Sequence, residues 1–586
     1  MNVMRILSIG IVAALLALSV AIGLNQATAF QRGPSGPPGA PDGVEVLTRG
    51  PVHEAFAETV TFDPEPGLVA PKAPPAPIEE APPEQRPEGA NVAWISGYWA
   101  WDDERTDYLW VSGIWRSLPP GRQWVSGYWG RSAGGAQWTS GYWADAKASE
   151  VEYLPEPPAT VEVGPNVAAP SPDHRWLPGS WLWQQNRYAW RPGYWAAGQS
   201  DWDWVPAHYV WTPRGYVFVD GYYDHSVARR GVLYAPVYFN SGIYTQRGFS
   251  YSPAVAINPA VFASHLFLRP GYGHYYYGDF YAANYATAGY SPWFSYNSSR
   301  YGYDPFYAQQ RWVHRQDRGW EQNIQADFQN RRDNASARPP RTWTDQARIA
   351  TAGAPNRQNI VMAASLAELA KSQEHPLKLQ SLDTAERKKL AQHQQAVRQL
   401  REQREKLEDA AADAAAAKSK SPREFQPSRV KLPPSPIVSL PADRLDKDHV
   451  PPKLDEAPQP DPKIAPTARN PRGKTKSVLV EPKPTTSAPP AEAPKSAPKG
   501  KSKGEPTASP SGGSNDAPPD APKGKSKVEP KASPPGGSTD VPPEAPKGKS
   551  KVEPKASPPG GSTDVPSDTP KGKSKGEAKK KSKNQP

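Results

Sequence analysis

The chain has 586 residues and a net charge of +11, with 72 prolines, 46 glycines and no cysteine. Its mean hydropathy is -0.73. A single compact globule of this length is excluded, because so polar and proline-rich a chain cannot bury enough apolar surface to offset the entropy of ordering it. The absence of thiols also excludes disulfide scaffolds, thiolate catalysis and cysteine-based zinc sites.

The N-terminus predicts a secretory signal peptide over residues 1–29. Met1–Arg5 is short and basic, and Ile6–Leu24 is an uncharged, largely apolar run. The sequence Ala-Thr-Ala that follows predicts cleavage between Ala29 and Phe30. An uncleaved membrane anchor is the alternative, because the apolar run is almost long enough to cross a bilayer. No later segment is apolar enough to span one. We therefore expect an exported protein of the periplasm, cell envelope or extracellular space, without a transmembrane span after cleavage.

Tryptophan repeats are the most informative feature of the chain. Residues 30–90 are proline-rich, contain no Trp or Tyr, and are expected to form a disordered linker. Residues 91–223 then hold 17 of the 21 tryptophans, in units of the form Trp-x-x-Gly-x-Trp. The units form two blocks, 94–143 and 176–223. Six units are complete, and two degenerate ones begin at Trp204 and Phe218. The defining residues are Trp94, Gly97, Trp99, Trp110, Gly113, Trp115, Trp124, Gly127, Trp129, Trp138, Gly141, Trp143, Trp176, Gly179, Trp181, Trp190, Gly193, Trp195 and Trp204.

The composition of the repeats predicts antiparallel strands. Trp, Tyr and Val favour strands, and turn-forming sequences lie between the units. A hairpin at every such turn predicts two four-stranded meanders crossed by columns of tryptophans. The predicted cross-strand pairs are Trp99 with Trp110, Trp115 with Trp124, Trp110 with Trp129, Trp129 with Trp138, and Trp124 with Trp143. Each glycine leaves room for a neighbouring indole. The geometry at the glycine stays open between a kinked strand, with or without a bulge, and a second turn.

These units resemble the Trp-x-x-Gly-x-Trp (YXWGXW) repeat family of exported bacterial proteins. The resemblance covers about 130 residues and rests on the repeats given above. That family has no assigned biochemical activity, so the resemblance implies a location in the cell envelope more than a function. The two units with Pro-Gly at their centre, in 176–195, are closest to the usual form, and the Ser-Gly units of the first block depart slightly.

After the repeats, residues 224–345 form a Tyr- and Phe-rich extension, expected to be short strands and ordered loops packed on the repeats. Its last part, 311–345, is charged and predicts a surface helix. Residues 346–420 are expected to be helical, with a short helix over 359–371 and a longer one from near Asp383 to about Lys418. The longer helix is either a weak coiled coil or an amphipathic helix docked on the domain. Its predicted seam is Leu390, His393, Val397, Leu400, Arg404, Leu407, Ala411 and Ala414.

The C-terminal region, 421–586, is expected to be a disordered tail rich in Pro, Lys and Ser. The sequence Pro-Lys-Gly-Lys-Ser-Lys recurs with a 24-residue period, and no apolar face is present that could stack. The tail has 31 basic and 19 acidic residues, so the positive charge of the chain belongs to it. We expect it to bind polyanions or to act as a solvated spacer. Without interleaved aromatics, sequence-specific nucleic-acid recognition is not expected.

The chain carries no catalytic motif in the structural context that its chemistry needs. The Gly-x-Ser-x-Gly pattern occurs only in a turn between two repeat units, at 130–134, and in the tail, at 500–504 and 572–576, where no strand-to-helix elbow is expected. There is no Walker loop and no His-Glu-x-x-His. The histidines are scattered, and His208 and His225 are interpreted as surface or interface packing. The acidic turn Asp102, Asp103 and Glu104 is interpreted as solvated. No enzyme, metal or cofactor is therefore expected.

The residues thus favour an exported, non-catalytic cell-envelope protein whose aromatic repeats are a mainly β structural or interaction module. The alternative is a protein that binds a glycan or cell-wall polymer through exposed Trp and Tyr. The expected partners are a wall polysaccharide or an envelope protein, with a polyanion at the tail. The two interpretations differ in whether a column of tryptophans faces solvent.

Overall fold

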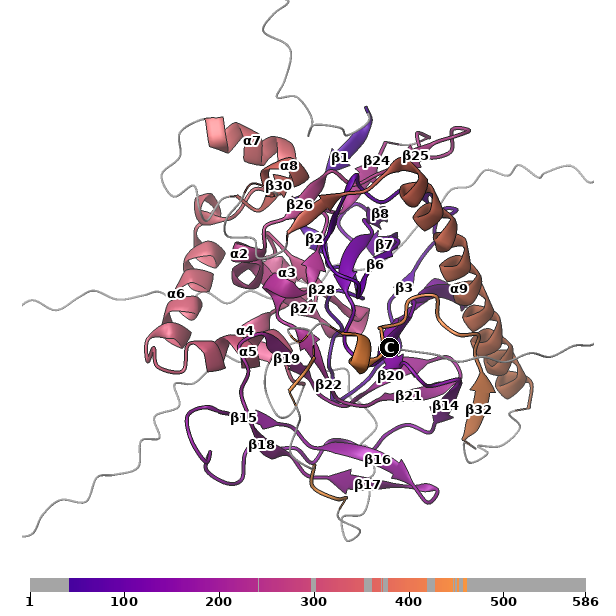
Figure 1. Cartoon of the computed structure of the whole chain (residues 1–586), viewed down its shortest axis with the longest axis vertical. Coiled ribbons are helices and arrows are strands. Elements are labelled where there is room, and N and C mark those ends of the chain that lie inside the picture. Colours follow the sequence, from indigo (N-terminus) through magenta and orange to yellow (C-terminus); the bar gives the residue numbers. More distant parts are fainter. Residues whose placement is uncertain are drawn as a thin grey trace, which may run out of the picture. The chain divides into compact units, whose positions relative to one another are not determined.

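The computed structural model of the chain is mainly β, with helices in its second half (Figure 1). The signal peptide with Ala29 and Phe30, and most of the C-terminal tail, lie outside the residues that it describes. No helix among the described residues is long and apolar enough to span a membrane. The described residues are 42–240, 242–296, 302–351, 361–369, 371, 378–418, 427–445, 447, 450–452 and 457–460.

The tryptophan repeats fold two at a time into four long hairpins, which we call hairpins 1 to 4. Each hairpin has an outer and an inner pair of strands in one continuous register. Their strands are, for hairpin 1, β6 (Val92–Ile95), β7 (Tyr98–Asp102), β8 (Asp107–Val111) and β9 (Ile114–Ser117); for hairpin 2, β10 (Arg122–Val125), β11 (Tyr128–Ser132), β12 (Gly135–Thr139) and β13 (Tyr142–Asp145); for hairpin 3, β15 (His174–Leu177), β16 (Ser180–Gln184), β17 (Arg187–Arg191) and β18 (Tyr194–Ala197); and for hairpin 4, β19 (Trp202–Val205), β20 (His208–Thr212), β21 (Gly215–Val219) and β22 (Tyr222–His225).

The register confirms three of the predicted tryptophan pairs, namely Trp99–Trp110, Trp129–Trp138 and Trp124–Trp143. Two are wrong, because Trp115 pairs with Trp94 and not Trp124, and Trp110 does not pair with Trp129. The two four-stranded meanders are accordingly not formed. The turn between hairpins 1 and 2 contains two prolines, which lack an N–H. Instead of β10, β9 pairs with β23 (Gly231–Val232) from the extension.

The strands are kinked at the repeat glycines, which settles the geometry left open above. The pairs Ile95–Ile114 and Tyr98–Val111, on either side of the kink, belong to one register. The chain therefore does not reverse at the glycine. Only the residue before the glycine and the glycine itself leave the ladder, on both strands at the same level.

The segment before the repeats is packed on the domain from residue 42 onward, so the prediction of a disordered linker over 30–90 is wrong for its described part. Ala55 and Val60 are fully buried. Short apolar stretches between the prolines account for this, because proline is compatible with extended edge strands. The strands are β1 (Val44–Val46), β2 (Gly50–Pro51), β3 (Val69–Ala70), β4 (Glu79–Glu80) and β5 (Gln85–Pro87).

The Tyr- and Phe-rich extension packs on the repeats, because β24 (Val237–Phe239) pairs with β8 of hairpin 1 and also with β1. The charged part is helical, and α6 (Trp320–Asp333) buries none of its residues, which agrees with a surface helix. Asp304 caps α5 by accepting from Tyr307 N at 2.7 Å, and Pro305 follows it. The remaining elements are η1 (Val227–Arg229), β24 (Val237–Phe239), β25 (Ser250–Tyr251), β26 (Val255–Ile257), α2 (Pro259–Phe262), η2 (Ala263–His265), β27 (Leu266–Arg269), η3 (Pro270–Tyr272), β28 (His274–Tyr277), α3 (Ala283–Thr287), β29 (Ser291–Pro292), α4 (Trp293–Tyr296), α5 (Pro305–Val313), α6 (Trp320–Asp333), η4 (Ala335–Ala337) and α7 (Trp343–Thr351).

The helical segment contains one long helix, α9 (Thr384–Lys418), as predicted. Asp383 accepts from Glu386 N at 2.7 Å and caps it. The short helix expected over 359–371 is wrong in extent, because its described part is β30 (Ala363–Ser365), paired with β26, and α8 (Leu366–Leu369). The remaining strand of this segment is β31 (Leu379–Ser381).

Helix α9 docks on the repeat domain, where it contacts β11 of hairpin 2. Val397, Leu400 and Arg404 of the predicted seam are buried, but His393 is exposed and Gln394 is buried in its place. The docked amphipathic helix is therefore the alternative that the contacts favour over the coiled coil.

The tail begins later than the sequence predicts. Residues 428–431 form β32 (Ser428–Lys431), which pairs with β14 (Glu150–Leu154) from the stretch between the two blocks. Ile437 is 2% exposed, and Ser435 Oγ donates to the carbonyl of Trp124 at 2.6 Å. The boundary at 421 is thus wrong, because the apolar residues of 428–440 pack on hairpin 2. A short 3-10 turn, η6 (Ala442–Arg444), follows.

Candidate functional site

Hairpins 1 and 2 each have a buried glutamate at the kink. At each kink the glycine N–H groups have left the strand ladder and need an acceptor. In hairpin 1, Gly97 N and Gly113 N donate to the two oxygens of Glu80 at 2.7 and 2.9 Å. In hairpin 2, Gly127 N and Gly141 N donate to the two oxygens of Glu54, both at 2.9 Å.

Hairpins 3 and 4 use variants of the same arrangement. In hairpin 3, Glu162 Oε2 accepts from Gly179 N at 2.6 Å and Glu162 Oε1 accepts from Trp176 Nε1 at 3.2 Å. In hairpin 4 the first glycine is replaced by alanine, and Glu58 bonds to His208 Nε2 at 3.0 Å and to the Tyr222 hydroxyl at 2.8 Å. Each hairpin therefore binds one carboxylate from outside the repeats. We call these four residues, Glu54, Glu58, Glu80 and Glu162, the closing glutamates.

The indoles explain why glycine is required at these kinks. A Cβ on Gly113 would lie 2.6 Å from Trp94 Cζ2, and one on Gly141 would lie 2.5 Å from Trp124 Cζ2. The same contact recurs in hairpins 3 and 4. The prediction that the glycine accommodates a neighbouring indole is thus confirmed, with the indole supplied by the paired repeat across the hairpin.

The electrostatics of the closing glutamates are set by burial. Glu54 and Glu80 are 4% and 2% exposed. Burial raises the pKa of each carboxyl to about 7, even though the glycine N–H groups favour the charged form. The two carboxylates are held in the protein interior mainly by backbone donors.

The hydrogen bonds of Glu54 give a direct prediction. Glu54→Gln keeps the shape of the side chain but turns one acceptor oxygen into an NH₂ group, which would face a glycine N–H. We expect the free energy of unfolding to fall by about 1–3 kcal/mol at pH 8, because a buried donor then has no acceptor. Thermal melting of the full chain measures this, with Glu88→Gln at an exposed position as the control. Equal melting temperatures of Glu54→Gln and the wild type would show that the bonds do not hold the kink.

The predicted repeat residues all lie in the described part of the chain, and most of their tryptophans are buried. Trp129, Trp176 and Trp195 are half-buried, and the others of the predicted set are 8% exposed or less. None of the 21 tryptophans of the whole chain is exposed. No column of tryptophans faces solvent.

The closing glutamates are functional features that the sequence interpretation missed. Glu54 and Glu80 lie in the segment predicted to be a linker, and Glu162 lies in the proline-rich stretch between the two blocks of repeats. A local signal exists, because each of them is next to valine, isoleucine, alanine or another glutamate in a short apolar stretch. The hairpin that each glutamate serves could not be deduced, because Glu54 is 73 residues away from Gly127.

A buried ionic cluster joins hairpins 1 and 4. Asp224 accepts from Arg116 at 2.5 and 2.6 Å and from Arg230 at 3.3 Å, and Arg230 also bonds to Asp203 at 2.7 Å. All four side chains are 3% exposed or less. Burial opposes ionisation of Asp224, but the two arginines outweigh it and lower its pKa. For Asp203 burial dominates and raises the pKa to about 7.

Helix α9 contributes a second buried ion pair, at the kink of hairpin 2. Arg404 Nε donates to Glu408 at 3.0 Å, and both side chains are fully buried. Glu408 also accepts from the hydroxyls of Tyr128 and Tyr153 at 2.8 and 2.9 Å. Arg404 Nη1 donates to the carbonyls of Ser126 and Ser140, which precede the two kink glycines. The second hairpin is therefore held by Glu54 through its N–H groups and by Arg404 through its carbonyls.

The polar residues considered for catalysis have structural partners. His208 and His225 are buried, which excludes a surface position and agrees with the other alternative of the prediction, packing at an interface. The acidic turn is not simply solvated, because Glu104 pairs with Arg49 and Arg341 at 2.6 Å, and Asp103 pairs with Arg269. Within the described ranges, no group of three or more His, Asp or Glu could hold a metal ion.

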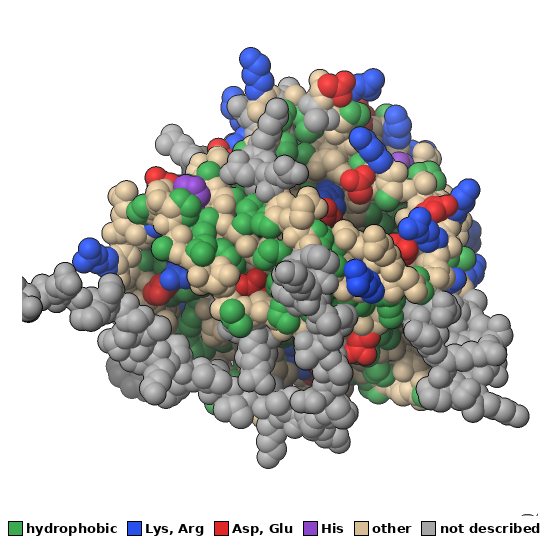
Figure 2. Space-filling model, turned by 90° about the horizontal axis from the view of Figure 1, so that it is seen from below, with side chains coloured by type: hydrophobic (Ala, Val, Ile, Leu, Met, Phe, Trp, Pro, Cys, Tyr) green, Lys and Arg blue, Asp and Glu red, His purple; other side chains and the backbone are tan. Residues whose placement is uncertain are grey.

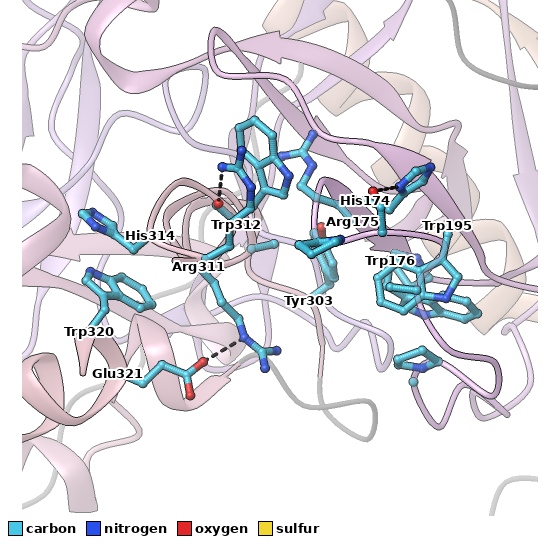
Figure 3. A pocket seen from close by; sticks show the side chains of 18 of the residues that line it. His174, Arg175, Trp176, Trp195, Tyr303, Arg311, Trp312, His314, Trp320 and Glu321 are labelled. Atoms are coloured by element: carbon cyan, nitrogen blue, oxygen red, sulfur yellow. Dashed lines mark hydrogen bonds and ion pairs between the residues drawn. The ribbon is translucent and has the colours of Figure 1, made fainter. Parts of the chain in front are cut away.

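A cavity with a volume of about 710 Å³ lies between hairpin 3 and helices α5 and α6 (Figure 3). Trp176 and Trp195 lie on one side, His314 and Trp320 on the other, and Trp312 between them. These four tryptophans are half of the eight half-buried tryptophans of the chain. The volume and the aromatic lining are typical of small-molecule sites.

Comparisons with known proteins identify no relative. No protein-family model, no curated protein and no solved structure matches the chain. The closing glutamates and the aromatic cavity are the features on which a function can be argued.

Proposed function

We propose that the protein is an exported, non-catalytic cell-envelope protein whose aromatic-repeat β domain is a structural and interaction module. One observation carries this proposal: the tryptophans and glycines of the repeats pack against one another. Each hairpin places its indoles over the opposite glycines and takes a carboxylate from another segment. A row of sugar-stacking platforms would instead leave these indoles exposed.

The acidic groups support a non-catalytic role. Glycosidase chemistry needs two carboxyl groups that flank a bond of the substrate. The buried carboxyl groups of Glu54 and Glu80 are occupied by backbone N–H groups, and the turn carboxylates Asp103 and Glu104 are in ion pairs. These groups hold the domain together.

The proposed export to the cell envelope is tested by determining the N-terminus of the protein in its host. The basic start, the apolar run and the resemblance to the YXWGXW family support export. N-terminal sequencing of the protein purified from envelope fractions should give Phe30 as the first residue. A protein that retains Met1 and sediments with the cytoplasm would overturn the proposal.

The tail provides a separate prediction about retention in the envelope. Residues 461–586 hold 25 basic and 13 acidic residues, whereas the described face in Figure 2 has basic and acidic side chains interspersed with hydrophobic ones. We propose that the tail binds polyanions by counterion release. A chain ending at Pro460 should leave envelope fractions at 20 mM NaCl, while the full chain should leave only near 500 mM. The deletion starts at 461 because 428–440 pack on the domain.

The control for this deletion keeps the length of the tail. Lysine-to-glutamine changes in the four Pro-Lys-Gly-Lys-Ser-Lys sequences preserve its prolines and remove charge. These variants should elute at lower salt than the wild type. Retention of the chain ending at Pro460 at low salt would show that the folded domain is the anchor.

A second candidate function, glycan or cell-wall polymer binding, is favoured by the cavity beside hairpin 3. Half of the half-buried tryptophans of the chain line it, together with arginine and histidine side chains. Saturable co-sedimentation of the full chain with the host's own wall polysaccharides at 500 mM NaCl, competed by a defined sugar, would support it. Absence of binding by the folded chain would leave the structural module as the function.

A further inference from the structure

Resting on this second candidate function, we infer that the cavity beside hairpin 3 is a binding site for an acidic saccharide. The carboxylate of a uronic-acid unit would bond to Arg175 and Tyr303 of its lining, and the sugar rings would lie against its tryptophans. The inference combines the aromatic walls with the hydrogen-bonding capacity that remains in the lining.

The walls of the cavity offer aromatic faces from two parts of the fold. Trp176 of β15 and Trp195 of β18 form an edge-to-face pair with ring centres 5.5 Å apart. On the other side Trp320, at the start of α6, is stacked on His314 at 5.2 Å, with the ring planes 8° apart. Large aromatic side chains bury much area at little conformational cost, and their faces suit the flat C–H surfaces of sugar rings.

Two residues of the lining, Arg175 and Tyr303, each have a buried polar atom without a hydrogen-bond partner among the described residues. Arg175 is 5% and Tyr303 7% exposed. Arg175 bonds through its Nη atoms to Gln309 and to the carbonyl of Trp202. Among the residues that the structure describes, its Nε has no hydrogen-bond partner, and neither has the Tyr303 hydroxyl. Burial raises the pKa of Tyr303 to about 12 and Arg175 opposes this rise, so the two groups are neighbours. Buried polar atoms are normally satisfied, so this pair indicates a missing ligand.

The carboxylates of the lining already have donors. Glu162 accepts from Gly179 N and Trp176 Nε1, Glu321 from Arg311 and the Tyr307 hydroxyl, and Asp317 from Gly319 N.

On the cationic side, Arg318 forms no ion pair within the part of the chain that the structure describes, and Arg175 Nε is unpartnered. The hydrogen-bonding groups of the lining that remain for a ligand are therefore donors, and they suit an anion more than a neutral sugar.

The experiment titrates the full chain with two probes of equal size in 500 mM NaCl. The probes are a galacturonate trimer and the neutral galactotriose, followed by isothermal titration calorimetry. High salt screens the charges of the basic tail but has less effect on a buried contact. We expect one galacturonate trimer per chain, bound at least tenfold more tightly than galactotriose, because a hydrogen bond to a charged group is stronger than one to a neutral group.

Two variants test the position of the site. Tyr303→Phe removes only the unpartnered hydroxyl and should weaken galacturonate binding about tenfold without lowering the melting temperature. Trp183→Ala, a half-buried tryptophan of hairpin 3 outside the cavity, is the matched control and should bind as the wild type does.

The outcomes separate this inference from the function on which it rests. Equal affinity for both trimers would overturn the acidic specificity and keep a glycan-binding protein. Galacturonate binding that Tyr303→Phe leaves unchanged, or that disappears at high salt, would overturn the cavity as the site. Binding of neither trimer would overturn the inference, and the co-sedimentation with wall polysaccharides then decides about the second candidate function.

Discussion

Gly127→Val should lower the free energy of unfolding by about 3 kcal/mol or more, because the kink of hairpin 2 has no room for a side chain. A Cβ at this position would lie 2.5 Å from Trp138 Cζ2, 2.6 Å from Glu54 Oε1 and 2.8 Å from the carbonyl oxygen of Thr139. The indole is 2% exposed and cannot move out of the way. Overpacking of a well-packed core typically costs 1–3 kcal/mol, and the contact with a backbone carbonyl adds to it.

Thermal and urea-induced unfolding of the full chain, monitored by tryptophan fluorescence, measure this effect. The matched control is Gly271→Ala, where a Cβ meets no atom within 4 Å and the backbone needs no positive φ. The control should unfold like the wild type. A melting temperature that Gly127→Val leaves unchanged would refute the packing of the repeats described above.

Asp224→Ala should lower the free energy of unfolding by a similarly large amount. The cause here is the loss of a buried charge and not a change in side-chain volume. Asp224 is the partner of Arg116 and a second partner of Arg230. The alanine variant would leave Arg116 fully buried without a counter-charge. Breaking a buried ion pair on one side costs about 3–5 kcal/mol.

An exposed aspartate close in sequence provides the control for this variant. Asp220 pairs with Arg191 at 3.3 Å, and its side chain is 60% exposed. Because exposed pairs contribute about 0–1 kcal/mol, Asp220→Ala should change the urea midpoint little. The double variant Arg116→Met with Asp224→Leu should recover part of the lost stability, since it leaves no unpaired charge at this position. Equal effects of Asp224→Ala and Asp220→Ala would show that the cluster is not coupled to folding.

Local pattern predicted the strands, the long helix and part of the register. Trp99–Trp110 and Trp129–Trp138 flank short turns, so their pairing follows from the sequence between them. The failure at Trp115 has a physical reason. A turn sequence allows a hairpin but does not require one, and β9 had a competing partner in β23, more than 100 residues later.

Composition alone misled the interpretation of the flanking segments. Residues 42–90 and 428–440 resemble linkers on average, because proline dominates them. Single apolar or acidic residues attach these segments to the folded domain, such as Ala55 and Ile437 in the core and Glu80 at a kink. The aromatic cavity was not predictable for a related reason. It combines Trp176 and Trp195 with Trp312 and Trp320, whose proximity depends on tertiary packing.

The closing glutamates imply that the repeat visible in the sequence is only half of the physical unit. Starts of successive units within a block are 14 to 16 residues apart, but a hairpin needs two units and one acid supplied by another segment. A chain that gained one unit would carry an indole without an opposite glycine and a glycine N–H without an acceptor. Such repeats should therefore be duplicated or lost in twos, each pair with its own glutamate. Grafting a single unit onto another protein should not yield a folded hairpin.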